Sequence, residues 1–541
     1  MPSNLRFALT GATALAAAGA CTQREAEPKK PLNVVYIMCD DHSYQTISAY
    51  DRRYMRTPHI DRIADEGARF TNSFVANSLS GPSRACLLTG KHSHANGFTN
   101  NEHGIFDGSQ QTLPKLLQAG GYQTAMVGKW HLVSDPTGFD YWDILTGQGD
   151  YYNPVFIRNG ERIVRPGYST DITTDVAFEW LEKRDPDKPF CLFLHYKAPH
   201  RSWMPDLQDL GMFDDVTFPL PETFYDDYAT REAAAKQEMS ILADMNVVYD
   251  LKMADRENEI HTPEQPWLED YGRDLYRRDL APGELVPGRM DAAQQAAWDA
   301  YYDPLIAQFK RDSLSGKALY EWKYQRYMRD YCSVIHSVDR NVGRVYDYLK
   351  EHGLLDNTVV IYTSDQGFFM GEHGYFDKRF MYEESFRTPL LVRMPGGRRH
   401  QDIDAFVQNI DYAPTILEMA GLPIPEDIQG ESFLPLLQGV KPSQVLTTEG
   451  KGWRKSLYYH YYEYPAEHSV RRHYGVRTER YSLMHFYNDI DEWELFDLEQ
   501  DPLQLHNLYG EPGMEAVTEE LRTELHRLQA LYEDPISRNI P

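Results

Sequence analysis

The chain has 541 residues, of which 42% are hydrophobic and 13% aromatic, and its net charge is −26. This composition is typical of a packed globular protein and excludes a largely disordered chain. The acidity argues against general nucleic-acid binding, because binding along a phosphate backbone needs a basic surface. The five cysteines show no CxxC spacing and indicate neither a disulfide framework nor a metal knuckle.

The first twenty residues differ from the rest of the chain. Arg6 is followed by a short apolar run with small residues, which ends at Cys21. The run is too short to span a membrane and is typical of an export signal. Small residues before Cys21 resemble a bacterial lipoprotein signal, which we favour over a plain cleaved signal. We predict a signal peptide over 1–20, lipidation of Cys21 as the first mature residue, and a tether over 21–31.

Four short apolar runs in the following part of the chain predict strands of a parallel sheet. They lack polar alternation, as expected of strands that are buried on both faces. The polar residues at their ends are Asp40 and Asp41, Lys129 and His131, Lys197 and His200, and Asp365 and Gln366. Open α/β sheets place their ligand site beyond the carboxyl ends of the strands, so we expect these side chains to converge.

The remaining segments predict how the chain is divided. Residues 112–121 and 332–353 predict helices, and residues 204–325 predict a helical and loop insertion. A boundary near 440–450 precedes three segments typical of antiparallel strands, at 455–465, 473–487 and 491–498. Residues 515–534 predict an amphipathic helix. We therefore expect a catalytic domain over 32–445 and a smaller subdomain over 446–541.

The converging side chains indicate two kinds of chemistry. Asp40, Asp41, Asp365 and Gln366 offer only oxygen ligands, which suit Ca²⁺ or Mg²⁺ better than zinc. An acidic pair alone is more often a solvated surface pair, so this inference depends on the convergence. The lysines and histidines would form a cationic pocket for an oxyanion. A histidine there could donate a proton to a leaving alkoxide.

A short segment, Ser80-Gly81-Pro82-Ser83-Arg84, by itself predicts a helix start with a serine cap. Followed by Leu88-Thr89-Gly90, it resembles the signature of the type I, formylglycine-dependent sulfatases. Five more segments are similar to that family: 33–41, 121–132, 197–203, 362–385 and 493–508. The resemblance implies an alkaline-phosphatase-like α/β sandwich around a large mixed, mainly parallel sheet, with a smaller C-terminal antiparallel-sheet subdomain.

The resemblance also implies a role for each site residue. Ser80 would be oxidised to formylglycine, which hydrates to a gem-diol. Arg84 would stabilise the ionised diol, His131 would bind its second hydroxyl, and His200 would protonate the leaving sugar oxygen. The metal, expected to be Ca²⁺, would be held by Asp40, Asp41, Asp365, Gln366 and the modified Ser80. The sulfate oxygens would be bound by Lys129, Lys197 and Lys378. Four rim candidates, each also open to a structural role, are Arg201, Trp203, His94 and Asn96.

Serine at position 80 resembles bacterial enzymes that a radical SAM maturase modifies before or during export. Residues 147–181 and 377–385 look most like members related to N-acetylglucosamine-6-sulfatase, which implies 6-O-sulfated glucosamine in a glycan as substrate. Alternatives are a sulfatase for uronic acid 2-O-sulfates or algal glycans, a two-zinc phosphatase or phosphodiesterase of the same superfamily, and a non-catalytic glycan-binding lipoprotein. The expected location is the periplasm or the outer membrane of a Gram-negative bacterium.

Overall fold

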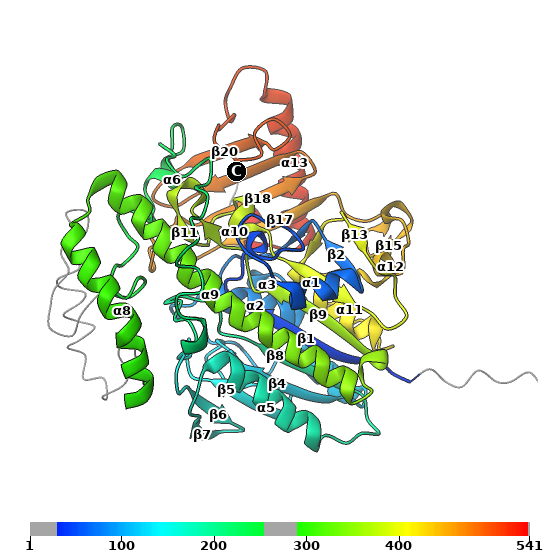
Figure 1. Cartoon of the computed structure of the whole chain (residues 1–541). Helices are drawn as coiled ribbons and strands as arrows, with labels where there is room; N and C mark the ends of the chain where they lie inside the picture. Colours follow the sequence, from blue (N-terminus) through cyan, green and yellow to red (C-terminus); the bar gives the residue numbers. More distant parts are fainter. Residues whose placement is uncertain (1–29, 254–288, 539–541) are drawn as a thin grey trace, which may run out of the picture.

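A ten-stranded mixed sheet forms the centre of the fold (Figure 1). Its five middle strands run parallel: β9 (Thr358–Ser364), β1 (Asn33–Cys39), β8 (Phe190–His195), β4 (Gln123–Gly128) and β5 (Tyr141–Leu145). The outer strands are β13 (Gln401–Ile403), β2 (Ala68–Phe70) and β12 (Leu390–Arg393) on one side and β6 (Val155–Arg158) and β7 (Glu161–Val164) on the other. The four apolar runs are therefore strands of the parallel part of the sheet, as predicted, and the structure places them next to one another.

This computed structural model describes residues 30–253 and 289–538. The predicted signal peptide and Cys21 lie outside these ranges. Within them, no helix combines the length and the apolar character that crossing a membrane requires.

The alternation of side chains along the central strands creates two hydrophobic cores, one on each face of the sheet. In β1, Val35 and Ile37 belong to one core, while Val34 and Tyr36 belong to the other. The helices α1 (Pro58–Asp65), α5 (Ser169–Lys183) and α9 (Gly316–Glu351) cover the first face. The helices α2 (Ser80–Thr89), α4 (Leu113–Ala119) and α11 (Tyr412–Met419) cover the second. A layer of helices on each face makes the sandwich that was expected.

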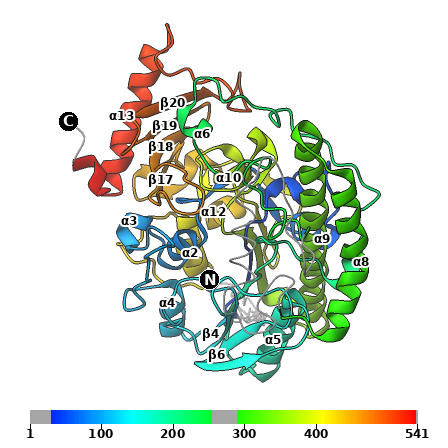
Figure 2. The same cartoon turned by 90° about the vertical axis from the view of Figure 1, so that its left-hand side faces the viewer.

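The described part of the predicted insertion combines loops with helices. Residues 204–253 are mostly irregular and contain the short helix α6 (Glu232–Ala235). The helix α8 (Ala292–Asp312) lies beside α9 in both views, and its Phe309 packs against Trp322 of α9 (Figures 1 and 2). Because α9 begins at Gly316 and runs on to Glu351, one continuous helix crosses the predicted end of the insertion at residue 325.

The C-terminal part is built on a four-stranded antiparallel sheet of β17 (Ser456–Tyr461), β18 (His473–Thr478), β19 (Tyr481–Phe486) and β20 (Glu492–Asp497). The predicted segment 473–487 contains two of these strands, which a short turn joins. The helix α13 (Glu515–Leu531) packs its leucines on one face of this sheet. Short connecting elements are α3 (Ser93–Asn96), α10 (Glu383–Phe386), α12 (Leu434–Leu437), β3 (Ser73–Phe74), β14 (Val407–Gln408), β10 (Phe369–Met370), β11 (Phe376–Asp377), β15 (Leu446–Thr447) and β16 (Gly450–Lys451).

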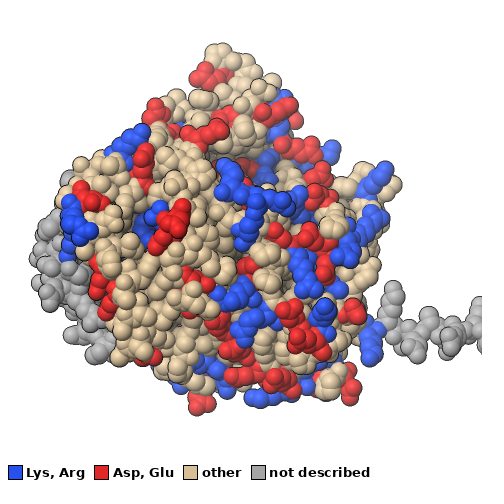
Figure 3. All heavy atoms as spheres, viewed as in Figure 1, with Lys and Arg blue, Asp and Glu red and all other residues tan. Residues whose placement is uncertain are grey.

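Acidic and basic side chains are interspersed over the face of the molecule shown in Figure 3. This face carries no broad basic patch, despite the many lysines and arginines on it. Positive charge for an anionic ligand is instead gathered in a buried site, which lies at the carboxyl ends of the central strands.

Candidate active site

The register of the central strands places the predicted site residues side by side at the carboxyl edge of the sheet. Gly128 at the end of β4 pairs with His195 at the end of β8. Met38 of β1 also pairs with His195, and Cys39 pairs with Ser364 at the end of β9. The residues that follow these four strands therefore start from neighbouring positions at one edge of the sheet, as the sequence predicts.

Ser80 is the first residue of α2 and not its cap. The N-cap position is taken by Leu79, whose side chain makes no capping hydrogen bond. Ser80 is only 2% exposed as a residue, and its hydroxyl instead donates to Asp40 Oδ1 over 3.1 Å. The reading of Ser80 as an ordinary helix cap is therefore wrong, because its side chain points to the strand ends and not to the backbone of its own helix.

Three buried carboxylates and one amide gather around Ser80. The Asp41 backbone N–H donates to Asp365 Oδ1 over 3.1 Å. The Gln366 amide nitrogen lies 3.3 Å from Ser80 Oγ and donates to Asp41. All four side chains have almost no solvent exposure. The sequence predicted this set as the metal ligands, and the structure brings its members together.

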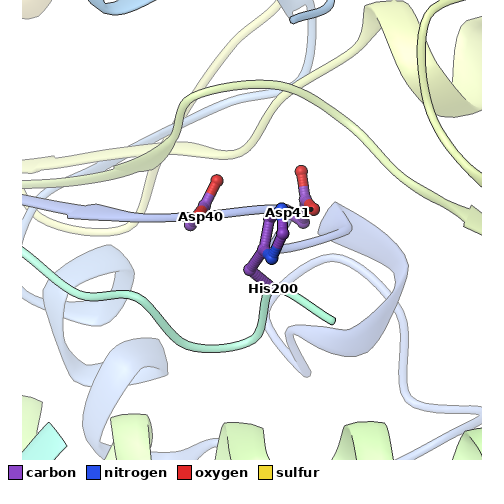
Figure 4. Close-up of side chains that lie close together, drawn as sticks. All are labelled: Asp40, Asp41 and His200. Carbon is purple, nitrogen blue, oxygen red and sulfur yellow. Dashed lines mark ion pairs between the residues drawn. The ribbon is translucent and has the colours of Figure 1, made fainter. Parts of the chain in front are cut away.

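The donor set fits a hard divalent cation. The side-chain oxygen of Gln366 is buried and has no hydrogen-bond partner among the residues that the structure describes, although it belongs to a cluster of carboxylates. A cation coordinated by these carboxylates would satisfy that oxygen, and oxygen donors suit Ca²⁺ or Mg²⁺. Asp40, Asp41 and His200 also offer ligand atoms within 4.8 Å of one another (Figure 4).

The pKa values of the three carboxyl groups are shifted in different directions, because each has different charged neighbours. Burial acts to raise the pKa of Asp40, but Lys129, His200 and Arg84 outweigh it and hold that pKa well below its usual range. Burial raises the pKa of Asp41 to about 6, against the charge of Lys378. Burial and the neighbouring Asp40 raise the pKa of Asp365 to about 7. Crowded acids of this kind are stabilised in their ionised form by a cation.

Two of the predicted sulfate-binding lysines contact this acidic cluster directly. Lys129 is fully buried and donates to Asp40 and, over 2.5 Å, to Gln148 Oε1. Lys378 donates to Asp41 Oδ2 over 2.7 Å. The third, Lys197, donates to the Arg201 carbonyl over 3.4 Å, and its ammonium lies 4.8 Å from the centre of the Tyr151 ring. Burial, reinforced by Lys129, lowers the pKa of Lys197 to about 8.

Arg84 projects from α2 into the same cluster. Its guanidinium donates to Asp365 Oδ2 through Nε and Nη2, at 3.1 and 2.9 Å. It also donates to the Lys129 carbonyl over 2.8 Å. His195 lies 3.3 Å from Arg84 Nη1, a contact that the sequence interpretation missed. The position of His195 at the end of a buried strand was the signal that could have identified it.

The two predicted catalytic histidines have different surroundings. His200 donates from Nδ1 to the Arg201 carbonyl over 2.7 Å, so its Nε2 faces Asp41 at 3.8 Å (Figure 4). His131 has a backbone φ of 56°, and its buried Nδ1 has no hydrogen-bond partner in the described part of the chain. Burial and the charge of Lys129 hold the pKa of both imidazoles well below the usual range. A non-glycine residue at positive φ is uncommon and marks local strain.

The four rim candidates are all held in internal contacts. Trp203 is fully buried and packs against Tyr327 at 4.6 Å between ring centres. His94 binds the Tyr532 carbonyl, and Asn96 binds the Lys91 carbonyl and the Phe98 N–H. Arg201 pairs with Asp250 through two hydrogen bonds of 2.9 and 2.8 Å and with Glu467 at 2.8 Å. The contacts of Trp203, His94 and Asn96 therefore favour a structural role for these three residues over a role at the rim of the substrate site.

Several residues beside the site were not anticipated from the sequence. Asp377 accepts hydrogen bonds from Arg379 and, over 3.0 Å, from His468 of the C-terminal subdomain. Asp250 comes from the predicted insertion, and Gln148 comes from the turn after β5. These residues belong to loops or to distant parts of the chain, and their contacts form only when the fold brings those parts together.

Comparison with known proteins gives the family of the chain. A model of the sulfatase family matches residues 32–422, and a model of the C-terminal part of N-sulphoglucosamine sulphohydrolase matches residues 371–531. The chain is 49% identical to an N-acetylglucosamine-6-O-sulfatase of Bacteroides thetaiotaomicron over 99% of this chain and 92% of the relative. It is 28% identical to a multifunctional alkaline phosphatase superfamily protein of Trinickia caryophylli, over 86% of this chain and 87% of that protein.

A solved structure in complex with its substrate, D-glucosamine-2-N,6-O-disulfate, superposes with a TM-score of 0.85. It shares 49% sequence identity and covers 94% of this chain and 99% of its own. The architecture is thus the alkaline-phosphatase-like sandwich with a small C-terminal sheet that the motifs implied. These matches favour a sulfatase over a phosphatase or a non-catalytic glycan-binding protein. The chain belongs to the sulfatase family and is a hydrolase of sulfate esters.

Proposed function

We propose that this sulfatase removes the 6-O-sulfate of glucosamine or N-acetylglucosamine in a glycan. The relative that shares almost half of its residues is named for that ester, and the similar solved structure holds a 6-O-sulfated glucosamine. These two proteins match nearly the whole chain and not the catalytic motifs alone. Sulfatases for uronic acid 2-O-sulfates or algal glycans remain the alternative.

The observation that carries the proposal is the position of the Ser80 hydroxyl. It lies 3.1 Å from Asp40, within a cluster that also contains Arg84 and Lys129. We propose that Ser80 is oxidised to formylglycine, whose hydrate supplies a nucleophilic hydroxyl and a second hydroxyl that allows sulfate to leave. Covalent catalysis of this type divides one difficult hydrolysis into two easier steps.

The surrounding side chains divide the remaining work. Lys129, Lys197 and Lys378 bind the sulfate oxygens and offset their charge in a site that excludes water. Arg84, held by Asp365, stabilises the ionised diol at position 80. His200 acts on the leaving sugar oxygen through Nε2, because Nδ1–H is committed to the Arg201 carbonyl. Donation from Nε2 requires the imidazolium form, which the anionic sulfate ester and Asp41, 3.8 Å from Nε2, would favour when substrate is bound. His131, with its unpartnered Nδ1, accepts a proton from the group at position 80.

The metal in this proposal is Ca²⁺, held by Asp40, Asp41, Asp365, Gln366 and the modified Ser80. It supplies a fixed positive charge beside the sulfate ester. We expect a chelator to abolish turnover and Ca²⁺ to restore it, as followed by sulfate release. Thermal unfolding gives a second readout, because a bound cation stabilises the folded state and raises Tm. Recovery with Zn²⁺ but not with Ca²⁺ would contradict the assignment.

The proposal extends to where and how the enzyme matures. The serine at position 80 and the N-terminal segment together favour modification by a radical SAM maturase before or during export. They also favour a periplasmic or outer-membrane-anchored protein, with Cys21 as the lipidated residue. The substrate would then be a sulfated oligo- or polysaccharide that reaches that compartment.

The proposal is tested with protein co-expressed with a serine-type maturase. Mass spectrometry of the Ser80 peptide should show the loss of two hydrogens, and protein expressed without the maturase should be nearly inactive. The matured enzyme is then given glucosamine and N-acetylglucosamine 6-sulfates, a uronic acid 2-sulfate and an algal sulfated saccharide. Turnover should be fastest on a 6-sulfate. Preference for another ester would overturn the substrate, and full activity with unmodified Ser80 would overturn the mechanism.

A further inference from the structure

A tight turn between β5 and β6 places one glutamine at the edge of the active site. The Gly149 N–H donates to the Thr146 carbonyl over 2.8 Å and closes the turn. Gly147 has a φ of 54°, a backbone angle that glycine adopts readily. A Cβ added there would meet no atom of the described residues within 4 Å, so glycine is favoured by this angle and not by a lack of space. The turn leaves Gln148 at its tip with an exposed side chain.

The orientation of the Gln148 amide is determined by its neighbour. The fully buried Lys129 ammonium lies 2.5 Å from Gln148 Oε1. An ammonium can only donate hydrogen bonds, so the oxygen of the amide must face it. The amide nitrogen then points away from Lys129 with two donor hydrogens. Among the described residues, no acceptor binds that nitrogen.

The same segment also reaches Lys197, a second of the three lysines proposed to bind sulfate. Tyr151, three residues after Gln148, lies with its ring 4.8 Å from the Lys197 ammonium. Its hydroxyl donates to the His200 carbonyl over 2.5 Å. Residues 146–151 therefore lie against Lys129, Lys197 and the segment that carries His200. An anion held between the two lysines would lie next to the turn.

We propose that Gln148 is a substrate-binding residue whose Nε2 donates a hydrogen bond to a terminal oxygen of the sulfate group. Its oxygen, by accepting from Lys129, keeps the nitrogen directed at the same anion that Lys129 binds. This inference rests on the proposed binding of sulfate by Lys129 and Lys197, but not on the identity of the sugar. A neutral donor adds a directional contact without further positive charge, which favours tetrahedral sulfate recognition over binding of any anion.

The alternative is that Gln148 only positions Lys129. Two variants separate these roles. Gln148→Glu keeps an oxygen that accepts from Lys129 but removes both donor hydrogens. Gln148→Ala removes the acceptor and the donors together. If positioning were the only role, Q148E would lose affinity only through repulsion of the anion by its added carboxylate, which high salt screens at this exposed position. At high salt it would then match wild type, while Q148A would still lose affinity.

The probe is inorganic sulfate, measured at high NaCl concentration as an inhibitor of the matured enzyme, with an aryl sulfate as reporter. We expect both Q148A and Q148E to weaken sulfate inhibition on the order of tenfold or more, the loss of one hydrogen bond to a charged group. KM for the aryl sulfate should rise in both variants. The matched control is Gln111→Ala, an exposed glutamine with one hydrogen bond of 3.1 Å to Asp427, and it should behave as wild type.

The result that would overturn the inference is wild-type sulfate inhibition in Q148E, with or without a loss in Q148A. This outcome is distinguishable from failure of the proposed substrate. Inhibition by inorganic sulfate does not depend on the sugar, whereas the substrate is tested by wild-type turnover of glucosamine 6-sulfates. Unchanged melting temperatures of the variants would show that the effect is local to the site.

Discussion

At the scale of single residues, the hydrogen bond between His200 Nδ1 and the Arg201 carbonyl determines which nitrogen can serve the reaction. Its length of 2.7 Å commits Nδ1 as a donor and leaves Nε2 facing the carboxylate cluster. The Arg201 carbonyl also accepts from Lys197. The Arg201 carbonyl oxygen therefore orients both the proton donor, His200, and a proposed sulfate-binding lysine, Lys197. The side chain of Arg201 is in turn held by its ion pair with Asp250.

Substitution of His200 should affect substrates according to their leaving groups. A sugar alkoxide is a poor leaving group and needs a proton, whereas an aryl oxide leaves more readily. We expect His200→Ala to lose roughly 10²–10⁴-fold in kcat on a sulfated sugar and much less on an aryl sulfate. Lys197→Ala is the comparison, because it is assigned to the sulfate that both substrates share, and it should lower both rates similarly. Equal losses for His200→Ala on the two substrates would assign the acid to another residue, with His131 next to be tested.

At the scale of elements, the site depends on how each central strand ends. β4 ends at Gly128, with φ of 97°, and the next N–H, that of Lys129, donates to the His195 carbonyl over 2.8 Å. This bend lets the chain leave the sheet while Lys129 stays buried beside β1. Glycine is needed at position 128 for two reasons. Its positive φ is unfavourable for other residues, and the backbone of the neighbouring strand β8 leaves no room for a side chain.

Gly128→Ala should therefore destabilise the protein far more than an ordinary glycine substitution. A Cβ at this position would lie 2.0 Å from the His195 carbonyl oxygen, which is backbone and cannot move aside cheaply. We expect a loss of roughly 3–5 kcal/mol in the free energy of unfolding, measured with urea. Gly121→Ala is the matched control, since its φ is 87° but no atom lies within 4 Å of the added Cβ. It should cost about 1–2 kcal/mol. Equal losses in the two variants would refute the steric explanation.

The elements also explain how much of the site the sequence could predict. Asp40, Lys129 and Asp365 were found because each follows an uninterrupted apolar run, and such runs identify buried parallel strands. Ser80 was found through its motif. Gln148 was not found, because its turn follows a shorter strand and its role depends on which lysine lies beneath it. The pairing of Arg201 with Asp250 is likewise a contact between distant segments, which no local pattern encodes.

At the scale of the whole molecule, the C-terminal sheet helps to build the active site. It packs against the segment that follows Lys378. The Tyr459 hydroxyl donates to the Arg379 carbonyl over 2.5 Å, and the Tyr382 hydroxyl donates to Glu494 over 2.8 Å. Its strands and the helix α13 were predictable from alternation and amphipathic pattern, but this docking was not, because it depends on side chains that lie far apart in sequence.

His473 of β18 lies where the C-terminal sheet packs against the segment that follows Lys378, and it makes the stability of the protein depend on pH. Its Nδ1 donates to the Arg471 carbonyl over 2.8 Å, and its Nε2 accepts from the Met381 N–H over 3.1 Å. Both contacts require the neutral imidazole, because a protonated Nε2 could not accept. Burial lowers the pKa of His473 to about 3, below the value of about 6.5 expected in the unfolded chain. The unfolded chain therefore takes up this proton first as the pH falls.

It follows that His473 contributes stability above pH 6.5 that is lost progressively as the pH falls towards 3. The expected slope from this residue is about 1.4 kcal/mol per pH unit in the free energy of unfolding. His473→Gln keeps a donor and an acceptor but cannot titrate. Urea unfolding between pH 7 and 5 should therefore give a flatter stability profile for this variant than for the wild type. His506→Gln, at an exposed position, should retain the wild-type slope. Parallel profiles for His473→Gln and the wild type would show that other groups control the acid sensitivity of this junction.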